Sequence, residues 1–141
     1  MMRKMSKRKR LLSQTDYTLL KQQLCENPGA ICLDEADLET LWSGETAFLW
    51  ESPPATSAEE AVRLARLAAA EMAPEPGRAI LAAVLYVVID SEVGLNTVEK
   101  IVNPIQQIYS KDANIILITE TRDEKGIRFS LATSEEREEM Q

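Results

Sequence analysis

The chain has 141 residues, which is enough for one domain, and its 45% hydrophobic and 28% charged residues are typical of a globular protein. Aromatic residues make up only 5%, so aliphatic side chains must supply most of the core. No run of 18 apolar residues occurs, which excludes a membrane-spanning helix. The lack of histidine excludes histidine-based catalytic triads, a histidine pH switch and most zinc sites.

Charge is unevenly distributed along the chain. Six of the sixteen basic residues lie in the first ten positions, so the remainder carries ten basic and 23 acidic residues. This acidic remainder argues against nucleic acid as the main partner. We expect residues 1–11 to form a disordered, solubilising basic tail; contact with nucleic acid, anionic lipid or an acidic protein surface is the alternative. Residues 135–141 are expected to form an acidic, solvated tail.

Residues 12–56 predict two helices and a short strand. A helix is expected over about 16–26, and Pro28-Gly29 ends it because proline cannot continue a helix. A second, short helix is predicted to start at Asp34, which is a good N-cap. A strand is predicted over 46–50.

Residues 57–134 predict the core of the domain. Ser57 and Glu60 form a capping box that opens a helix over 57–72, whose buried stripe consists mainly of alanine. The continuous apolar run over 80–89 is typical of a central strand that is buried on both faces.

A second helix of this core is expected over 97–109, after a capping box from Asn96 to Glu99. Pro104 predicts either a kink in this helix or a helix that begins near the proline. Strands over 114–121 and 127–133 follow, joined by a hairpin turn that ends at Gly126.

The predicted fold class is therefore α+β, with a mixed four-stranded sheet and the helices packed on one face. The four strands span residues 46–50, 80–89, 114–121 and 127–133.

The rare residue types are assigned to the core. Trp42, Phe48 and Trp50 are expected to pack inside, whereas an exposed tryptophan would indicate an interface anchor. Cys25 and Cys32 have no further cysteine partners, so we expect buried, reduced thiols and no metal. Reduced thiols, together with the lack of an apolar signal segment, predict a cytoplasmic protein.

No motif for catalysis or for cofactor binding is present. A phosphate-binding loop needs clustered glycines, because only glycine lets several backbone amides approach the anion, but here every glycine is isolated. No serine or cysteine lies in the context of an activated nucleophile. We therefore expect no catalytic residues, no cofactor and no enzymatic activity.

Two segments together resemble FtsZ, the bacterial homologue of tubulin. Residues 27–38 are similar to the FtsZ stretch in which the central helix ends at Pro-Gly and the catalytic synergy loop follows, with a pattern close to Pro-Gly-x-Ile-Asn-x-Asp-Phe-Ala-Asp-Val. Residues 57–133 are similar in the order and spacing of their elements to the FtsZ C-terminal domain, and 44–50 stand where the family has a Gly-x-Ala strand. The resemblance covers residues 18–133, and implies the C-terminal half of FtsZ without its GTP-binding domain or its terminal peptide.

Asp34 and Asp37 can be interpreted in two ways. They lie three residues apart at a helix start, on one face and near the positive end of the helix dipole, where both carboxylates are expected to stay ionised. In one interpretation they only cap this helix. In the other, which the resemblance implies, the pair enters the GTP pocket of the next subunit in a filament. The candidate partner interface is then Gly29, Cys32, Asp34, Glu35 and Asp37, although Cys32 replaces the family's asparagine and Glu35 its aromatic residue.

The resemblance implies a non-enzymatic interaction protein that binds or caps FtsZ-type filaments and so modulates cell division. Head-to-tail contacts need two complementary faces, so a chain with one such face joins a filament end without extending it. The alternative is a small binding or self-associating domain with the same fold and no role in division. A third hypothesis is a function that is enzymatic only together with a partner, in which Asp34 and Asp37 complete the partner's GTP site. The partner is expected to be a protein, and a homo-oligomer is left open.

Overall fold

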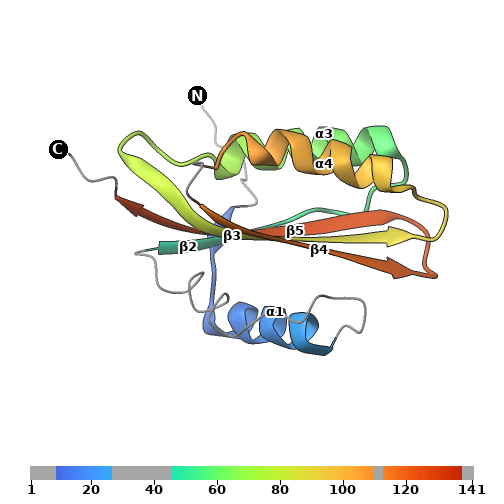
Figure 1. The fold of residues 1–141 in the computed structure, drawn as a ribbon, viewed down its shortest axis with the longest axis horizontal. Coiled ribbons are helices and arrows are strands. Elements are labelled where there is room, and N and C mark those ends of the chain that lie inside the picture. Colours follow the sequence, from blue (N-terminus) through green and yellow to red (C-terminus); the bar gives the residue numbers. More distant parts are fainter. Residues whose placement is uncertain (1–8, 27–45, 110–112, 138–141) are drawn as a thin grey trace, which may run out of the picture.

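The computed structural model describes residues 9–26, 46–109 and 113–137, and its centre is a five-stranded sheet with helices on both faces (Figure 1). The strand order is β1-β2-β5-β3-β4; β3 and β4 run parallel, and the other neighbours are antiparallel. The elements in chain order are β1 (Arg10–Leu11), α1 (Gln14–Glu26), β2 (Thr46–Glu51), α3 (Ala58–Met72), β3 (Arg78–Asp90), α4 (Leu95–Gln106), β4 (Asn114–Arg122) and β5 (Ile127–Arg137). No helix in these described ranges is long and apolar enough to cross a membrane.

β3 is an interior strand of the sheet, between β5 and β4, and is buried on both faces. Leu85 and Val87 belong to the core beneath α3 and α4, whereas Val84 and Tyr86 belong to the core on the α1 side. Such two-sided burial requires a continuous apolar run rather than an alternating one. The prediction of a strand over 80–89 that is buried on both faces is therefore confirmed, although β5 rather than β3 stands in the middle of the sheet. The strand is longer than predicted by three residues in total.

α3 begins and packs as its sequence predicts. The Ser57 hydroxyl accepts a hydrogen bond from the backbone N–H of Glu60 at 3.1 Å, and the Glu60 carboxylate accepts one from the backbone N–H of Thr56 at 3.0 Å. These bonds satisfy donors that a helix start leaves unpaired. The buried face is mostly alanine, which lets the helix approach the sheet and α4 closely: Ala61, Leu64, Ala65, Ala68, Ala69 and Met72.

α4 begins earlier than the sequence predicts. Its N-cap is Gly94 rather than Asn96, and no side chain caps it. The reason lies in the preceding turn, where the Asp90 carboxylate accepts the backbone N–H of Glu92 at 2.8 Å. The helix begins at Leu95, shortly after this turn. The backbone N–H of Thr97 donates to the carbonyl of Gly94 at 3.1 Å, which is a bond of the first helical turn.

Pro104 lies inside α4, which runs without interruption from Leu95 to Gln106. The alternative in which a helix starts near Pro104 is therefore wrong. The proline removes one backbone donor but lies close to the helix end, where few further bonds depend on it.

The sheet has five strands rather than the four predicted, because Arg10 and Leu11 form β1. They pair with Leu49 and Phe48 of β2 and cover the edge of that strand. The expectation of a disordered tail over 1–11 is therefore wrong for these two residues. A two-residue strand has no periodic pattern, so only its pairing with a distant strand reveals it.

β5 continues to Arg137, four residues beyond its predicted end at Thr133, and so includes residues assigned to the acidic tail. Glu135 pairs with Thr46 on one side and with Ile80 on the other. Its carboxylate is only 2% exposed, which a run of charged residues does not predict.

Helices α3 and α4 lie on one face of the sheet, as predicted, but α1 covers the other face (Figure 1). The prediction for the helices over 57–72 and 97–109 is therefore confirmed, and α1 adds a helix on the second face. Leu20 of α1 and the preceding Leu12 pack on Ile116 and Ile118 of β4. Because β3 and β4 carry apolar residues on both faces, a single helical layer would leave one of those faces in water.

Candidate functional site

The candidate partner interface predicted from the sequence lies outside the described residues. This applies to all five of its members, Gly29, Cys32, Asp34, Glu35 and Asp37, and also to Trp42. The segment 27–45 begins where α1 ends and finishes where β2 starts. The roles of Asp34 and Asp37 as caps or as interface residues both stay predictions.

Trp50 belongs to the core, as predicted. Its side chain is fully buried, its ring stacks on Phe129 with centroids 5.4 Å apart, and its Nε1 donates to the Glu71 carboxylate at 3.0 Å. A buried and hydrogen-bonded tryptophan is a core residue and not an interface anchor. Phe48 is half-buried, and the ammonium group of Lys9 lies 4.1 Å from its ring centroid.

A buried ionic cluster that the sequence did not predict lies at one end of the sheet. The Glu135 carboxylate accepts hydrogen bonds from Lys9 Nζ at 3.3 Å and from Arg78 Nε at 3.2 Å. Arg78 also reaches the Thr46 hydroxyl at 3.5 Å. The cluster ties the chain start to β3 and β5 beside the first residue of β2, so we assign it a structural role.

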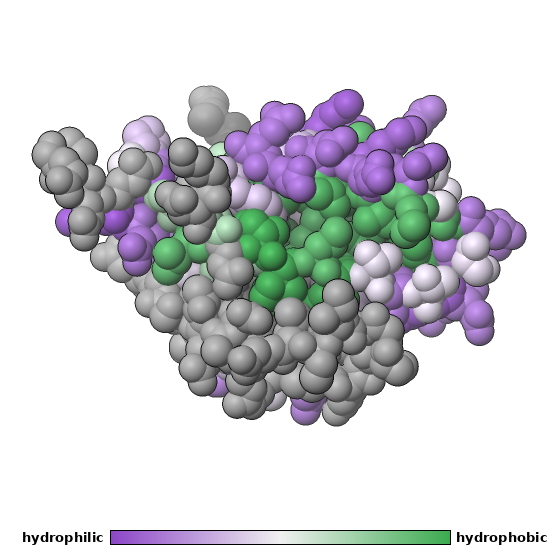
Figure 2. Space-filling model, in the orientation of Figure 1, coloured by the Kyte–Doolittle hydropathy of each residue, from purple (hydrophilic) through white to green (hydrophobic). Residues whose placement is uncertain are grey.

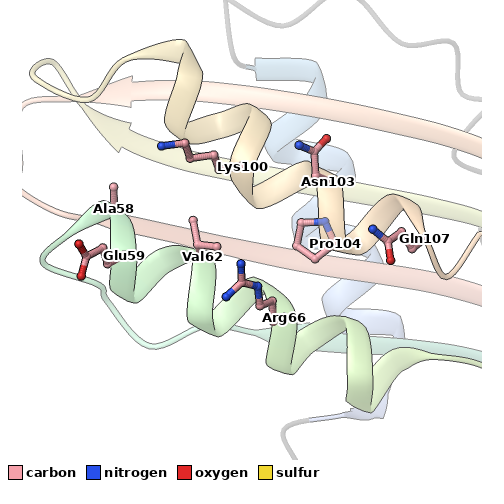
Figure 3. Close-up of a pocket in the computed structure, with 8 residues that line it drawn as sticks. All are labelled: Ala58, Glu59, Val62, Arg66, Lys100, Asn103, Pro104 and Gln107. Atoms are coloured by element: carbon pink, nitrogen blue, oxygen red, sulfur yellow. The ribbon is translucent and has the colours of Figure 1, made fainter.

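A groove of about 690 Å³ runs between α3 and α4 on the outer face of the helical layer (Figure 3). Ala58, Val62 and Pro104 supply its apolar lining. Arg66 from α3 and Lys100 from α4 bring positive charge to it, and Glu59 is its single acidic lining residue. The sequence alone does not predict this groove, because it exists only once the two helices lie side by side.

A second hollow of about 540 Å³ lies where α3 and α4 begin. Its charged groups are already engaged with one another. Lys125 Nζ contacts the Glu92 carboxylate at 2.6 Å, and Asp90 accepts the backbone N–H of Gly126 at 2.9 Å. The hydrogen bonds from Gly126 and then Glu92 lower the pKa of Asp90. This arrangement stabilises the hairpin turn at Gly126, whose φ of 119° suits glycine alone.

The outer edge of β4 is open among the described strands, since β4 stands last in the sheet order. Ile115 is 38% exposed and Leu117 48% exposed on this strand. In Figure 2 an apolar area lies at the level of the sheet, below the polar side chains of the helical layer. An open edge strand with exposed apolar side chains is a common place for association with another chain.

The described ranges hold no group of three or more cysteine, aspartate or glutamate side chains placed to bind a metal ion. The described surface has two features that no other described element covers, the groove between α3 and α4 and the outer edge of β4.

Comparison with solved structures shows which known fold this is. The chain matches no protein-family model and no curated protein sequence. It is similar to a structure of an FtsZ dimer from M. jannaschii, with a TM-score of 0.61 and 19% identity over 90% of this chain and 43% of that one. It is also similar to a point mutant of FtsZ from the same organism, with a TM-score of 0.63 and 17% identity over 85% of this chain and 39% of that one. The chain thus spans about two fifths of the length of these neighbours, and its fold is an FtsZ-like α+β fold.

Proposed function

We propose that the chain is a non-enzymatic interaction protein that binds FtsZ-type filaments and thereby modulates cell division. The observation that carries the proposal is the FtsZ-like fold over 85–90% of the chain. The pattern Pro28-Gly29 followed by Asp34 and Asp37 adds support, because it resembles the loop by which FtsZ subunits contact one another. One of the similar structures is an FtsZ dimer. Because this chain shares part of the FtsZ fold, we expect it to present part of the surface by which FtsZ subunits associate.

The proposed contact surface is the segment around Gly29–Asp37. Its two ends are anchored, because α1 packs on the sheet through Leu20 and β2 pairs with β5 along six residues. In the proposed complex the carboxylates of Asp34 and Asp37 approach the nucleotide site of the adjoining FtsZ subunit. Anchored flanks reduce the conformational entropy that such a segment loses on binding.

The proposed mode is capping of filament ends. A subunit that extends a head-to-tail filament needs two complementary faces, and this chain is proposed to present one. A capping protein acts well below equimolar ratios because filament ends are few. A protein that sequesters monomers needs nearly equal amounts, so titration of the chain separates the two modes.

Light scattering during FtsZ assembly tests the proposal. The wild-type chain should reduce assembly, and the variant Asp34→Ala/Asp37→Ala should have a weaker effect while costing about 1 kcal/mol of stability for a lost cap. The matched control is Asp123→Ala/Glu124→Ala, which removes the same charge from an exposed turn between β4 and β5. No effect of the wild-type chain at an equimolar ratio would overturn the proposal, as would an equal loss of effect in both double variants.

The proposal includes the absence of GTPase activity. With every glycine isolated, no backbone loop is available to surround a phosphate chain. Isothermal titration of the 141-residue chain with GTP should therefore show no binding, and micromolar affinity would contradict this part of the proposal.

The open edge of β4 favours a second candidate function, a self-associating domain without a role in division. Pairing of two such edges would cover Ile115 and Leu117, which are otherwise in water. Sedimentation velocity over a concentration series tests this function. It predicts a dimer that Leu117→Lys converts to a monomer, whereas a monomer at every concentration excludes it.

A further inference from the structure

We propose that the groove between α3 and α4 is a docking site for a short acidic segment of a partner protein. The groove is separate from the segment 27–45 on which the proposed filament contact rests. It belongs to the helical layer on the face of the sheet that α1 does not cover.

The shape of the groove follows from small and rigid side chains. Alanines bring α3 close to the sheet and to α4, and Ala58, Val62 and Pro104 are too short to fill the space outside this contact. The resulting volume of about 690 Å³ is within the range of sites that hold a few side chains or a small ligand. The floor is therefore apolar and can accept one or two aliphatic side chains of a docked segment.

The charge of the groove is opposite to that of the chain as a whole. The chain has a net charge of −7, yet the groove is lined by two basic residues and one acidic residue. Arg66 and Lys100 stand on different helices and make no ion pair within the described part of the chain. Two cations that have no ion-pair partner among the described residues, placed over an apolar floor, favour a ligand that combines carboxylates with aliphatic side chains.

The remaining polar residues of the groove suit a peptide. Asn103 and Gln107 from α4 each carry an amide that can donate to a peptide carbonyl and accept from a peptide N–H. A nucleic acid would need a wider basic surface, and the acidic remainder of this chain would repel it. The ligand is therefore an acidic peptide segment with aliphatic side chains.

Fluorescence anisotropy with a labelled peptide tests this inference. The probe is a ten-residue peptide of alternating glutamate and leucine, and its partner probe has glutamine in place of every glutamate. The acidic peptide should bind the full chain and the neutral one should not. Binding should weaken as salt rises, because the contacts lie near the surface.

Three charge-reversal variants test whether the acidic peptide binds in the groove. Arg66→Glu and Lys100→Glu should each weaken it roughly tenfold, since each replaces an attraction by a repulsion. The matched control is Arg63→Glu, which makes the same charge change on an exposed residue of α3 outside the groove. Circular dichroism on each variant checks that the fold is retained.

Four results would overturn the inference. They are no binding of the acidic peptide at about 1 mM, equal binding of the neutral peptide, an equal loss in the Arg63→Glu control, and binding to phosphatidylserine vesicles in place of the peptide. The last result would identify the groove as a membrane contact.

Discussion

Glu135→Gln should destabilise the protein through its buried ionic cluster. The carboxylate is 2% exposed and holds Lys9 at 3.3 Å and Arg78 at 3.2 Å. Glutamine keeps the volume and can accept one of the two hydrogen bonds, but it removes the negative charge that both cations share. Hydrogen bonds to charged groups contribute roughly 1.5–3 kcal/mol each.

The exposure of the two cations limits the loss. Breaking a fully buried ion pair costs about 3–5 kcal/mol, because one charge stays buried without a partner. Here the side chain of Lys9 is 16% exposed and that of Arg78 is 27% exposed, so both can turn towards water. We expect a loss of about 2 kcal/mol in the free energy of unfolding, or about 8 °C in the melting temperature for a chain of this size.

Urea denaturation followed by circular dichroism measures this loss. The control is Glu136→Gln, which removes the same charge from the next, exposed residue of β5 and should change stability by less than about 0.5 kcal/mol. Lys9→Met removes the ion pair with Glu135 and the ammonium group over the Phe48 ring, and should cost about 1 kcal/mol. The double variant with Glu135→Gln should lose less than the sum of the two single losses, since both remove one interaction. Equal stability of the Glu135→Gln and Glu136→Gln variants would refute the claim that the ionic cluster of Lys9, Arg78 and Glu135 stabilises the fold.

Three further predictions concern local contacts. A hydrogen bond from Arg10 is the main cause that lowers the pKa of Asp16 to about 2, so the stability this carboxylate contributes is present above about pH 4 and lost as the pH falls towards 2. Asp16→Asn should reduce the pH dependence of the free energy of unfolding between about pH 4 and pH 2. An unchanged pH dependence would contradict a stabilising ion pair between Arg10 and Asp16. Ser57→Ala should cost about 1 kcal/mol in urea denaturation, whereas Asn96→Ala, which is not the N-cap, should stay within about 0.5 kcal/mol. Trp50→Ala should cost about 4 kcal/mol by the same assay, and a loss below about 1 kcal/mol would place this ring outside the core.

The parts of the fold that could be predicted from the sequence are those set by local patterns. The apolar run of β3 and the alanine stripe of α3 each repeat over several residues, so their burial follows from period and composition. The Ser57 cap was also predictable, because its partner Glu60 lies three residues away. The order of these elements sufficed to predict the α+β class.

The parts that could not be predicted depend on contacts between distant residues. Lys9 and Glu135 are 126 positions apart, and each lies in a charged run that is typical of a solvated tail. The two residues meet only in the folded chain, where the Glu135 carboxylate is buried and the Lys9 ammonium group lies over the Phe48 ring. The position of α1 on the second face also depends on the whole sheet, because one helix alone does not indicate which face it covers. The groove depends in the same way on the placing of α3 beside α4.

The two proposed surfaces can be separated by experiment because they depend on different elements. Arg66 and Lys100 stand on α3 and α4, whereas the segment with Asp34 and Asp37 joins α1 on the opposite face to β2. Charge reversal in the groove should therefore leave the effect of the chain on FtsZ assembly unchanged, and the double aspartate variant should still bind the acidic peptide. If groove variants instead weaken the effect on assembly, FtsZ itself occupies the groove, and the two surfaces form one interface.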